Sequence, residues 1–389
     1  MHVKIIICFT RILRNTHREI FGLDHLISKG YNVVLLDLMK IHGGKSTCDD
    51  SLMLSLLKQC DSYEEIDHFV KSLDPEPVIY LSNDSYLTSS TYGSGSIGKL
   101  RRKQDKLLSY KTKTNPNQHE KPNLIRGILE KILKSSTHSF HYFDFLYKHK
   151  NNFVIPDYYM CSTNYTLPLK AILTVKRENI IIAHSDDVNK IIQDNSKVDN
   201  TKKTGVFLDQ VIPISLMKEL PENYFDTYYN SLSKTLNNLK VQLKLDEIII
   251  AGHPGSNVYA DRLDNKFDGF KRFQGNTQNL IKNAAYVFSH FSTAIGFAVY
   301  HKKPIIILAD DVLLNIKRVE NNINSFVNIL KIPIIHMNQE IIIKKEYSVI
   351  NEMEYNDFLK KYMKENVVNE NSYHYAIKQI SKDILNLKD

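Results

Sequence analysis

The stretch FQGNTQNLIKNAAYVFSHFSTAIGFAVYHKKPIIIL, residues 273–308, carries the clearest signal of the fold. Its apolar runs are separated only by short polar segments. Its periodicity predicts two helices alternating with two strands: a helix over 278–285 capped by Thr277, a strand over 286–288, a helix over 294–300 and a strand over 305–308.

The turn between the first of these strands and the second helix is polar. It reads Ser289-His290-Phe291-Ser292-Thr293 and stands where a strand ends and a helix begins. Backbone N–H groups and the positive end of the helix dipole point at such a turn, so it is suited to hold a phosphate. The simpler role of Ser292 or Thr293, as a helix cap, stays open.

The amino-terminal half shows the same alternation. An apolar run at 3–8, a helix near 17–28 ended by Gly30, and a buried run at 31–38 form a β-α-β opening, which indicates a parallel sheet. Further elements are expected in this half: helices at 50–60 and 63–72, and strands at 77–82, 171–175 and 179–183.

Three polar turns in the second half each follow an expected strand. The strand at 205–208 runs into Asp209-Gln210, the strand at 247–251 into Gly252-His253-Pro254-Gly255, and the third turn is the one described above. Ligands of open α/β sheets gather at the carboxyl ends of strands. A carboxylate, an imidazole and phosphate-holding hydroxyls at one edge are suited to group transfer.

Length and composition indicate a globular chain of two domains. It has 389 residues, 42% of them hydrophobic and 24% charged, with a net charge of +8. The domain boundary is expected within 185–205. The four cysteines have no CxxC spacing, which favours a reducing compartment without disulfides or a zinc site. No signal peptide and no window of about 18 apolar residues is present, so we expect a cytoplasmic protein.

Residues 99–114 form a basic segment, with seven Lys or Arg against one Asp. An amphipathic helical pattern follows at 124–133. Together, the basic residues of 99–134 could contact the inner membrane surface as a peripheral site. The alternative is that the helix packs into the first domain and the lysines are solvated. No RNA- or DNA-binding module surrounds the segment, so no nucleic-acid partner is expected.

Two other patterns are weak. Residues 93–98, GSGSIG, match GxGxxG, but they lie about ten residues beyond the nearest strand and lack the following acidic residue, which favours a glycine-rich loop over a dinucleotide site. His184, Asp186 and Asp187 could be drawn as metal ligands, but acids after a strand are usually helix caps or solvated groups. We therefore expect no metal site.

Three segments together resemble a known enzyme family: GHPGS (252–256), GNTQNLI (275–281) and FSHFSTAIGFAVYHKKPIII (288–307). They are similar to bacterial GT-B glycosyltransferases that use CMP-activated sugars, including sialyltransferase-like, Kdo- and nonulosonate-transferase enzymes. The resemblance implies an α/β GT-B fold of two Rossmann-like domains with a cleft between them. The implied domains are 1–190 with an insert at 93–122, 204–372 as the nucleotide-sugar domain, and 373–389 as a helix crossing back to the first domain.

The same resemblance implies the substrate-binding residues. His253-Pro254 and the pair Ser292 and Thr293 correspond to motifs that hold the CMP group. Their neighbours complete the expected CMP site: Gly255, Asn276, Thr277 and Ser289.

The catalytic carboxylate is less clear, because the chain lacks the acidic D/E-D/E-G triplet of many such enzymes. Asp209 is the first candidate for base or nucleophile and Asp84, in Asn83-Asp84-Ser85, is the second. His253 is the third catalytic candidate, as proton donor. Whether the reaction inverts or retains the sugar's configuration stays open.

The expected activity is transfer of an acidic sugar from a CMP donor to a surface-glycan or lipid-linked acceptor, in capsule or lipopolysaccharide assembly. The acidic sugar would be sialic, pseudaminic or legionaminic acid or Kdo. CMP-sugar enzymes of this kind tend to work without a divalent ion, and no cofactor is expected. Two alternatives remain: a GT-B enzyme that uses a UDP-sugar, either a transferase or an epimerase, and a non-catalytic, membrane-associated subunit of glycan assembly.

Overall fold

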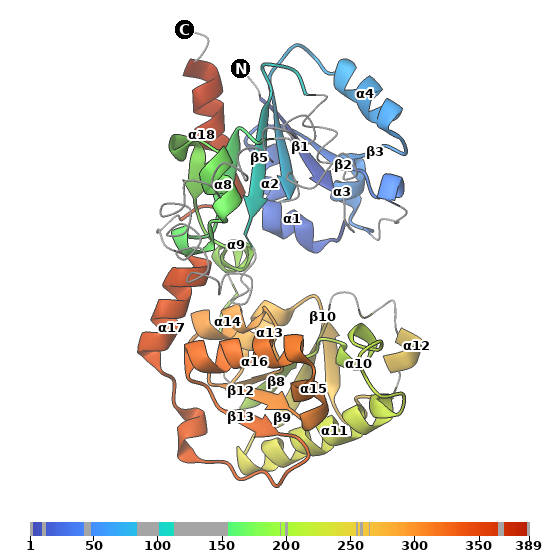
Figure 1. Cartoon of the computed structure of the whole chain (residues 1–389), viewed down its shortest axis with the longest axis vertical. Helices are drawn as coiled ribbons and strands as arrows, with labels where there is room; N and C mark the ends of the chain where they lie inside the picture. The colour runs from blue at the N-terminus through green and yellow to red at the C-terminus, as the bar shows by residue number, and fades with distance from the viewer. Residues whose placement is uncertain are drawn as a thin grey trace, which may run out of the picture. The chain divides into compact units, whose positions relative to one another are not determined.

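A computed structural model gives the structure of the chain (Figure 1). It describes residues 3–9, 13–42, 48–83, 101–112, 155–194, 196–198, 201–253, 256, 260–263, 265–364 and 369–386. The chain divides into two compact units. The first unit comprises residues 1–113, 119–193 and 364–389, and the second comprises 114–118 and 194–363. Within the described ranges, no helix combines the length and the apolar character needed to cross a bilayer.

The first unit is built on a seven-stranded sheet in which every pairing is parallel. The strand order is β3-β2-β1-β4-β5-β6-β7, so the order reverses between β1 and β4, as in doubly wound folds. Its strands are β1 (Lys4–Phe9), β2 (Asn32–Asp37), β3 (Leu57–Gln59), β4 (Val78–Asn83), β5 (Lys106–Lys111), β6 (Tyr158–Cys161) and β7 (Ile180–Ile182).

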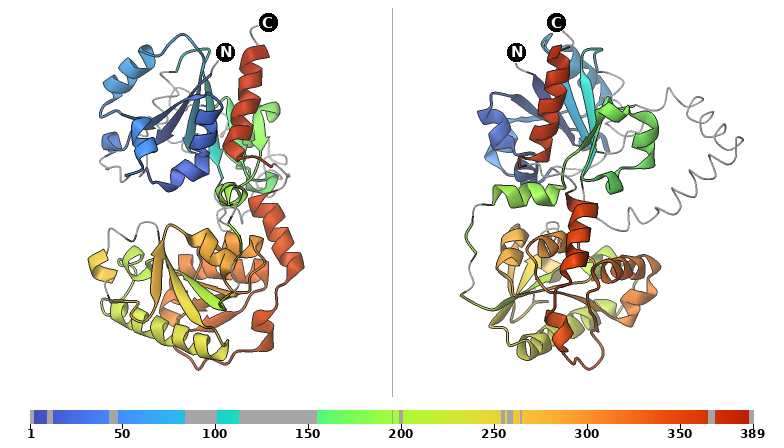
Figure 2. Two further views of the ribbon diagram at one scale, coloured as in Figure 1. Left: turned by 180° about the vertical axis from the view of Figure 1, so that it is seen from behind. Right: turned by 90° about the vertical axis from the view of Figure 1, so that its left-hand side faces the viewer.

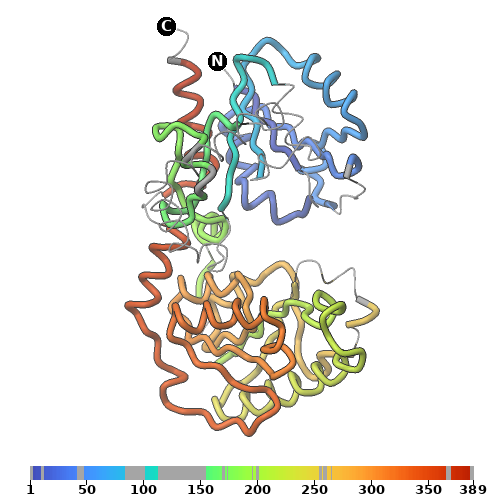
Figure 3. The backbone as a smooth tube through the Cα atoms, viewed as in Figure 1, coloured from blue at the N-terminus to red at the C-terminus, as the bar shows by residue number. Residues whose placement is uncertain are grey.

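The helices of this unit are α1 (Thr16–Phe21), α2 (Leu23–Ser28), α3 (Ser51–Ser55), α4 (Tyr63–Lys71), α8 (Leu169–Thr174), α9 (Asp186–Gln193) and α18 (Ser372–Asn386). The last of them comes from the far end of the chain, and the colours of Figure 3 make this return visible. Figure 2 shows α18 lying along one face of the first unit's sheet. The expected carboxy-terminal helix therefore exists, and it packs on the first unit.

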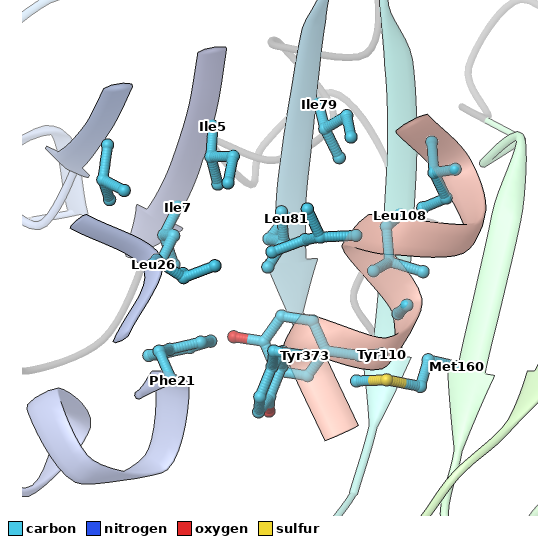
Figure 4. Packing of buried hydrophobic residues seen from close by; sticks show 14 of the residues in the cluster. Ile5, Ile7, Phe21, Leu26, Ile79, Leu81, Leu108, Tyr110, Met160 and Tyr373 are labelled. Atoms are coloured by element: carbon cyan, nitrogen blue, oxygen red, sulfur yellow. The ribbon is translucent and has the colours of Figure 1, made fainter. Parts of the chain in front are cut away.

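Helix α18 belongs to the hydrophobic core of the first unit. Tyr373, Ala376, Ile377 and Ile380 are fully buried on one face of the helix, at helical spacing. They join a cluster that includes side chains of β1, β4 and β5, several of which are drawn in Figure 4. A sequence segment near position 375 thus completes a core that begins at position 3.

Polar contacts fix the start of α18 against the end of α1 and against Gly22, which separates α1 from α2. The Asn371 Nδ2 atom donates to the Ile20 carbonyl at 2.8 Å, and His374 Nε2 lies 3.0 Å from the Gly22 carbonyl. Gly22 has φ +60°, and a Cβ there would lie 2.6 Å from His374 Nε2. Only glycine suits both the left-handed backbone and this close approach. It also splits the single helix expected at 17–28 into α1 and α2.

The second unit has a six-stranded sheet, again with parallel pairings, in the order β10-β9-β8-β11-β12-β13. Its strands are β8 (Thr204–Leu208), β9 (Glu247–Gly252), β10 (Lys271–Gln274), β11 (Tyr286–Ser289), β12 (Ile305–Ala309) and β13 (Ile334–His336). The order reverses between β8 and β11, in the same manner as between β1 and β4.

Helices cover both faces of this second sheet. They are α10 (Ile212–Ser215), α11 (Tyr224–Gln242), α12 (Ala260–Leu263), α13 (Thr277–Asn283), α14 (Ile295–Tyr300), α15 (Asp311–Asn315), α16 (Lys317–Leu330) and α17 (Glu352–Phe358), which a π-helical turn continues to Met363. Figure 1 shows α11 on one side of the strands, and α13, α14 and α16 on the other.

Several expected elements are corrected by this structure. The helix expected at 50–60 ends at Ser55, and the chain then forms β3 beside β2. The strand expected at 171–175 lies in helix α8 instead. Three further strands, β5, β6 and β10, were not expected. The sequences of β5 and β10, KLLSYK and KRFQ, carry charges that hide a strand pattern, and only pairing with a neighbour decides their conformation.

Part of the basic segment has a structural role. Arg101 forms an ion pair with Asp157. Arg102 pairs with buried Asp105 and donates to the Glu76 carbonyl at 2.7 Å. These two arginines thus hold loops of the first unit, and the segment's charge is only partly available to a membrane. Residues 113–134 lie outside the described residues, so a membrane contact there stays a prediction.

We expect Ile380→Ala to destabilise the first unit by about 2–4 kcal/mol, because the change leaves a cavity under the sheet. Ile380 is fully buried in the core shared with β1 and β4. Hydrogen exchange at the β1 and β4 amides would report the loss. The matched control is Lys378→Ala on the exposed side of the same helix, where the side chain only pairs with Glu370 at 3.6 Å. Equal exchange rates in the two variants would contradict the role of α18 in this core.

Candidate functional site

The three polar turns singled out in the sequence follow neighbouring strands of the second sheet. His253 follows β9, Asp209 and Gln210 follow β8, and residues 290–293 follow β11. Since these strands are parallel, the turns share the carboxyl edge of the sheet. They also stand at the position where the strand order reverses, which is where doubly wound sheets bind their ligands.

A hydrogen bond joins two of the turns across this reversal. The Phe291 N–H donates to Gln210 Oε1 at 2.9 Å. On the β11 side, the Ser292 N–H donates to Ser289 Oγ at 3.2 Å, and the Ala294 N–H donates to Ser292 Oγ at 3.3 Å. The hydroxyls of Ser289 and Ser292 thus shape the turn itself. Thr293 is exposed.

The hydroxyl pair precedes the helix and does not cap it. Helix α14 begins at Ile295, and its N-cap residue is Ala294, without a side-chain capping bond. The chain enters the helix through two short turns, in which Ile295 N–H donates to the Ser292 carbonyl and Gly296 N–H to the Thr293 carbonyl. The expectation of Ser292 or Thr293 as the cap is therefore wrong by one or two positions.

His290 forms a buried link beneath the turn. Its Nδ1 lies 2.6 Å from the Leu308 carbonyl, which can only accept, so Nδ1 carries the proton. Its Nε2 then accepts from the Tyr228 hydroxyl at 2.7 Å. Burial lowers the pKa of His290 to about 4, so the ring is neutral near pH 7. It ties β11, β12 and α11 together, and it is not a proton donor to substrate.

Asp209 is buried, with only 1% of its side chain exposed. Its Oδ1 accepts from the Val211 N–H at 2.9 Å. Val211 has φ +53°, a left-handed conformation that is rare for a β-branched residue. Burial raises the pKa of the Asp209 carboxyl, and the Val211 N–H and Arg272 oppose that rise. A nucleophile needs an accessible oxygen, which this conformation does not present.

Arg272 is the site residue that the sequence analysis missed. It lies on β10, yet its guanidinium reaches Asp209 Oδ2 at 3.6 Å and keeps 29% of the side chain exposed. The signal was hidden because β10 reads as a charged loop in sequence. Its neighbour on β9 is Gly252, the last residue of that strand, where a Cβ would lie 3.2 Å from Arg272 Nε.

The backbone at His253 is fixed, while the residue itself is exposed. Its carbonyl accepts from the Ser256 N–H at 2.9 Å, from Ser256 Oγ at 2.8 Å and from Gln274 Nε2 at 2.9 Å. The imidazole therefore stands at the strand end on a well-supported backbone. Pro254 and Gly255, expected in the same motif, lie outside the described residues.

The remaining expected residues are placed as follows. Asn276 is exposed at the N-cap position of α13 without a side-chain capping bond, and Thr277 is the first helical residue, so the expectation of Thr277 as the cap is wrong by one. Asp84 directly follows β4 in the chain but lies outside the described residues. Their part in a substrate site stays a prediction.

The residues once considered as metal ligands have other partners. His184 Nε2 lies 2.8 Å from the Glu370 carbonyl, and Asp186 accepts from the Tyr373 hydroxyl at 2.9 Å. In the part of the chain that the structure describes, no three His, Cys, Asp or Glu side chains gather as a ligand set.

Comparison with known proteins identifies the architecture. No protein-family model and no curated protein sequence matches the chain. Solved structures do match: the wall teichoic acid polymerase TagF has a TM-score of 0.51 at 11% identity, over 100% of this chain and 90% of that chain. The chain has the GT-B fold. Its two Rossmann-like domains correspond to the two units described above.

Other solved structures match at lower scores. The UDP-GlcNAc 2-epimerase of Methanocaldococcus jannaschii matches with a TM-score of 0.47 and 12% identity, over 98% of this chain and 100% of that chain. The glycotransferase of kitacinnamycin matches with a TM-score of 0.45 and 11% identity, over 97% of both chains. At these identities the likeness concerns the fold, and the chemistry has to come from the residues.

The buried histidine predicts a pH dependence of stability. The pKa of His290 falls from 6.5 in the unfolded chain to about 4 in the fold, so unfolding takes up a proton between these values. Stability from this residue is full above pH 6.5 and is lost as the pH falls to 4, by about 3 kcal/mol. Between pH 7 and pH 4, the free energy of unfolding of His290→Asn should therefore fall by about 3 kcal/mol less than that of the unsubstituted protein. Urea unfolding at the two pH values would measure this difference. Identical losses would contradict a neutral, buried His290.

Proposed function

We propose that this chain is a glycosyl-transfer enzyme that binds a nucleotide-activated sugar at the carboxyl edge of its second sheet. The carrying observation is that Asp209-Gln210, His253 and the 289–293 turn follow three adjacent strands at the reversal of strand order. The hydrogen bond between Gln210 and Phe291 holds two of these turns in one arrangement. The GT-B fold supports the class of reaction.

The chemistry proposed for this edge is positioning and charge stabilisation. The 289–293 turn with its exposed Thr293 would hold a donor phosphate, and the exposed imidazole of His253 would donate a proton or a hydrogen bond to the leaving group. The donor is a substrate, and we propose no further cofactor and no metal ion. The acceptor would be a surface glycan or a lipid-linked saccharide.

Among donors, we propose a UDP-sugar first, for transfer or for epimerisation. The CMP-sugar interpretation depends on an accessible carboxylate as base or nucleophile. The side chain of Asp209, its first candidate, is 1% exposed and has one oxygen bound to the Val211 N–H. A UDP-sugar mechanism that does not use Asp209 as nucleophile avoids this difficulty.

A CMP-linked acidic sugar is the second candidate. It is favoured by one observation: the residues of both resemblance motifs, His253 and the pair Ser292 and Thr293, follow β9 and β11 at the same sheet edge. Only β8 separates these two strands.

A thermal-shift panel of CMP, CDP, UDP and GDP separates these candidates. We expect UDP to stabilise the protein most, by about 2–3 kcal/mol at one hundred times its dissociation constant. Thr293→Val should weaken that shift, whereas Thr227→Val, an exposed threonine on α11, should not. Stabilisation by CMP and not by UDP would replace the first donor with the second. No shift with any nucleotide would favour a non-catalytic subunit.

Removal of the imidazole tests catalysis. We expect His253→Ala to lower turnover of the donor selected by the panel by about 10²–10⁴-fold, because proton transfer to the leaving group is lost. The melting temperature should change little, since His253 is exposed. His336→Ala is the matched control, a histidine that ends β13 on the same sheet, two strands from β11. Full activity in His253→Ala would exclude this role.

A further inference from the structure

Arg272 crosses from one strand to the end of another. It belongs to β10 at the margin of the second sheet, and its guanidinium lies 3.6 Å from Asp209 Oδ2, beyond the end of β8. The intervening strand is β9, whose last residue is Gly252. Because glycine has no side chain, the guanidinium passes over that strand end without a clash.

A ring fixes the guanidinium from a second direction. Its central carbon lies 5.7 Å from the centroid of the Phe267 ring, within the range of a cation–π contact. Phe267 in turn packs edge-on against Tyr229, with ring centroids 5.3 Å apart. The aromatic contact, the glycine and the carboxylate together restrict a side chain that would otherwise move freely.

Asp209 is built to hold this cation. Its Oδ1 is satisfied by the Val211 N–H, and its buried Oδ2 has no hydrogen bond within the described chain. A buried carboxylate oxygen is costly without an opposite charge nearby, and Arg272 supplies that charge. The pair leaves most of the five guanidinium N–H donors unused by Asp209, on a side chain that is 29% exposed.

We propose that Arg272 contacts a phosphate group of the donor, and that Asp209 is a positioning residue which aims the guanidinium at it. This inference rests on the proposed function. The fork of an arginine matches two oxygens of one phosphate, unlike the point charge of a lysine. Gln210 directly follows Asp209 and is hydrogen-bonded to the 289–293 turn. A nucleoside phosphate at this edge would therefore have Arg272 on one side and the turn on the other.

The test compares each nucleotide with its own nucleoside, because the ratio of the two affinities isolates the phosphate. Titration calorimetry would use UDP against uridine and CMP against cytidine. We expect Arg272→Gln to lower the affinity for the nucleotide by about 10–100-fold, because charged hydrogen bonds to the phosphate are lost. The affinity for the nucleoside should change less than about twofold. The nucleotide affinity of Arg272→Lys should lie between that of the unsubstituted protein and that of Arg272→Gln.

Arg318→Gln is the matched control. Arg318 also pairs with a carboxylate of the second unit, Glu219, but that pair is exposed on both sides. The variant should bind nucleotide and nucleoside as the unsubstituted protein does. Equal nucleotide losses in Arg318→Gln and Arg272→Gln would overturn the assignment, because a general charge effect would explain both.

Asp209→Asn tests the positioning role. The asparagine keeps the size and the Oδ1 acceptor for the Val211 N–H, and it replaces the charged Oδ2 that faces Arg272 with a neutral NH2 group. We expect nucleotide affinity to fall by about three- to tenfold with nucleoside affinity unchanged, and the double variant with Arg272→Gln to bind no worse than Arg272→Gln alone, since both act through one contact. Equal losses for nucleotide and nucleoside would indicate a structural role and overturn this part.

The outcomes separate this inference from the proposed function. If a nucleotide binds and Arg272→Gln leaves the ratio of nucleotide affinity to nucleoside affinity unchanged, the inference is wrong and the proposed function stands. If none of CMP, CDP, UDP and GDP binds the unsubstituted protein, both are overturned.

Discussion

Parallel pairing of β8 with β9 on one side and β11 on the other is the constraint on which the second unit depends. Parallel strands end at the same edge, so residues after each strand meet although 44 or more positions of sequence separate Asp209 from His253 and Thr293. The reversal of strand order between β8 and β11 then sends the following helices to opposite faces.

Buried polar contacts stabilise that edge from below. His290 connects Leu308 to Tyr228, and Asp209 holds Val211 in a left-handed conformation. Burying such polar groups costs free energy, and their hydrogen bonds offset this cost only when each partner is in place. They link the ends of β8, β11 and β12 to neighbouring groups, and catalysis by pre-arranged dipoles and charges needs such fixed contacts. The strain at Val211 lies in the same turn, which is where strained backbone tends to occur.

In the first unit, one face of the sheet is covered by a helix from the end of the chain. Helix α18 supplies Tyr373, Ile377 and Ile380 to a core made mostly by residues before position 184. The approach requires Gly22, since any side chain there would meet His374. The core of the first unit is therefore built from two parts of the chain that the second unit separates in sequence.

The sequence by itself determined the alternation of helices and strands, because apolar periodicity and turn residues are local signals. It also determined that polar turns follow β8, β9 and β11. Tertiary structure alone decided the strands β3, β5 and β10, whose short or charged sequences become strands only beside a partner. It also decided that Asp209 is buried and that Arg272 reaches it over Gly252, since burial and long-range ion pairs depend on which strands lie together.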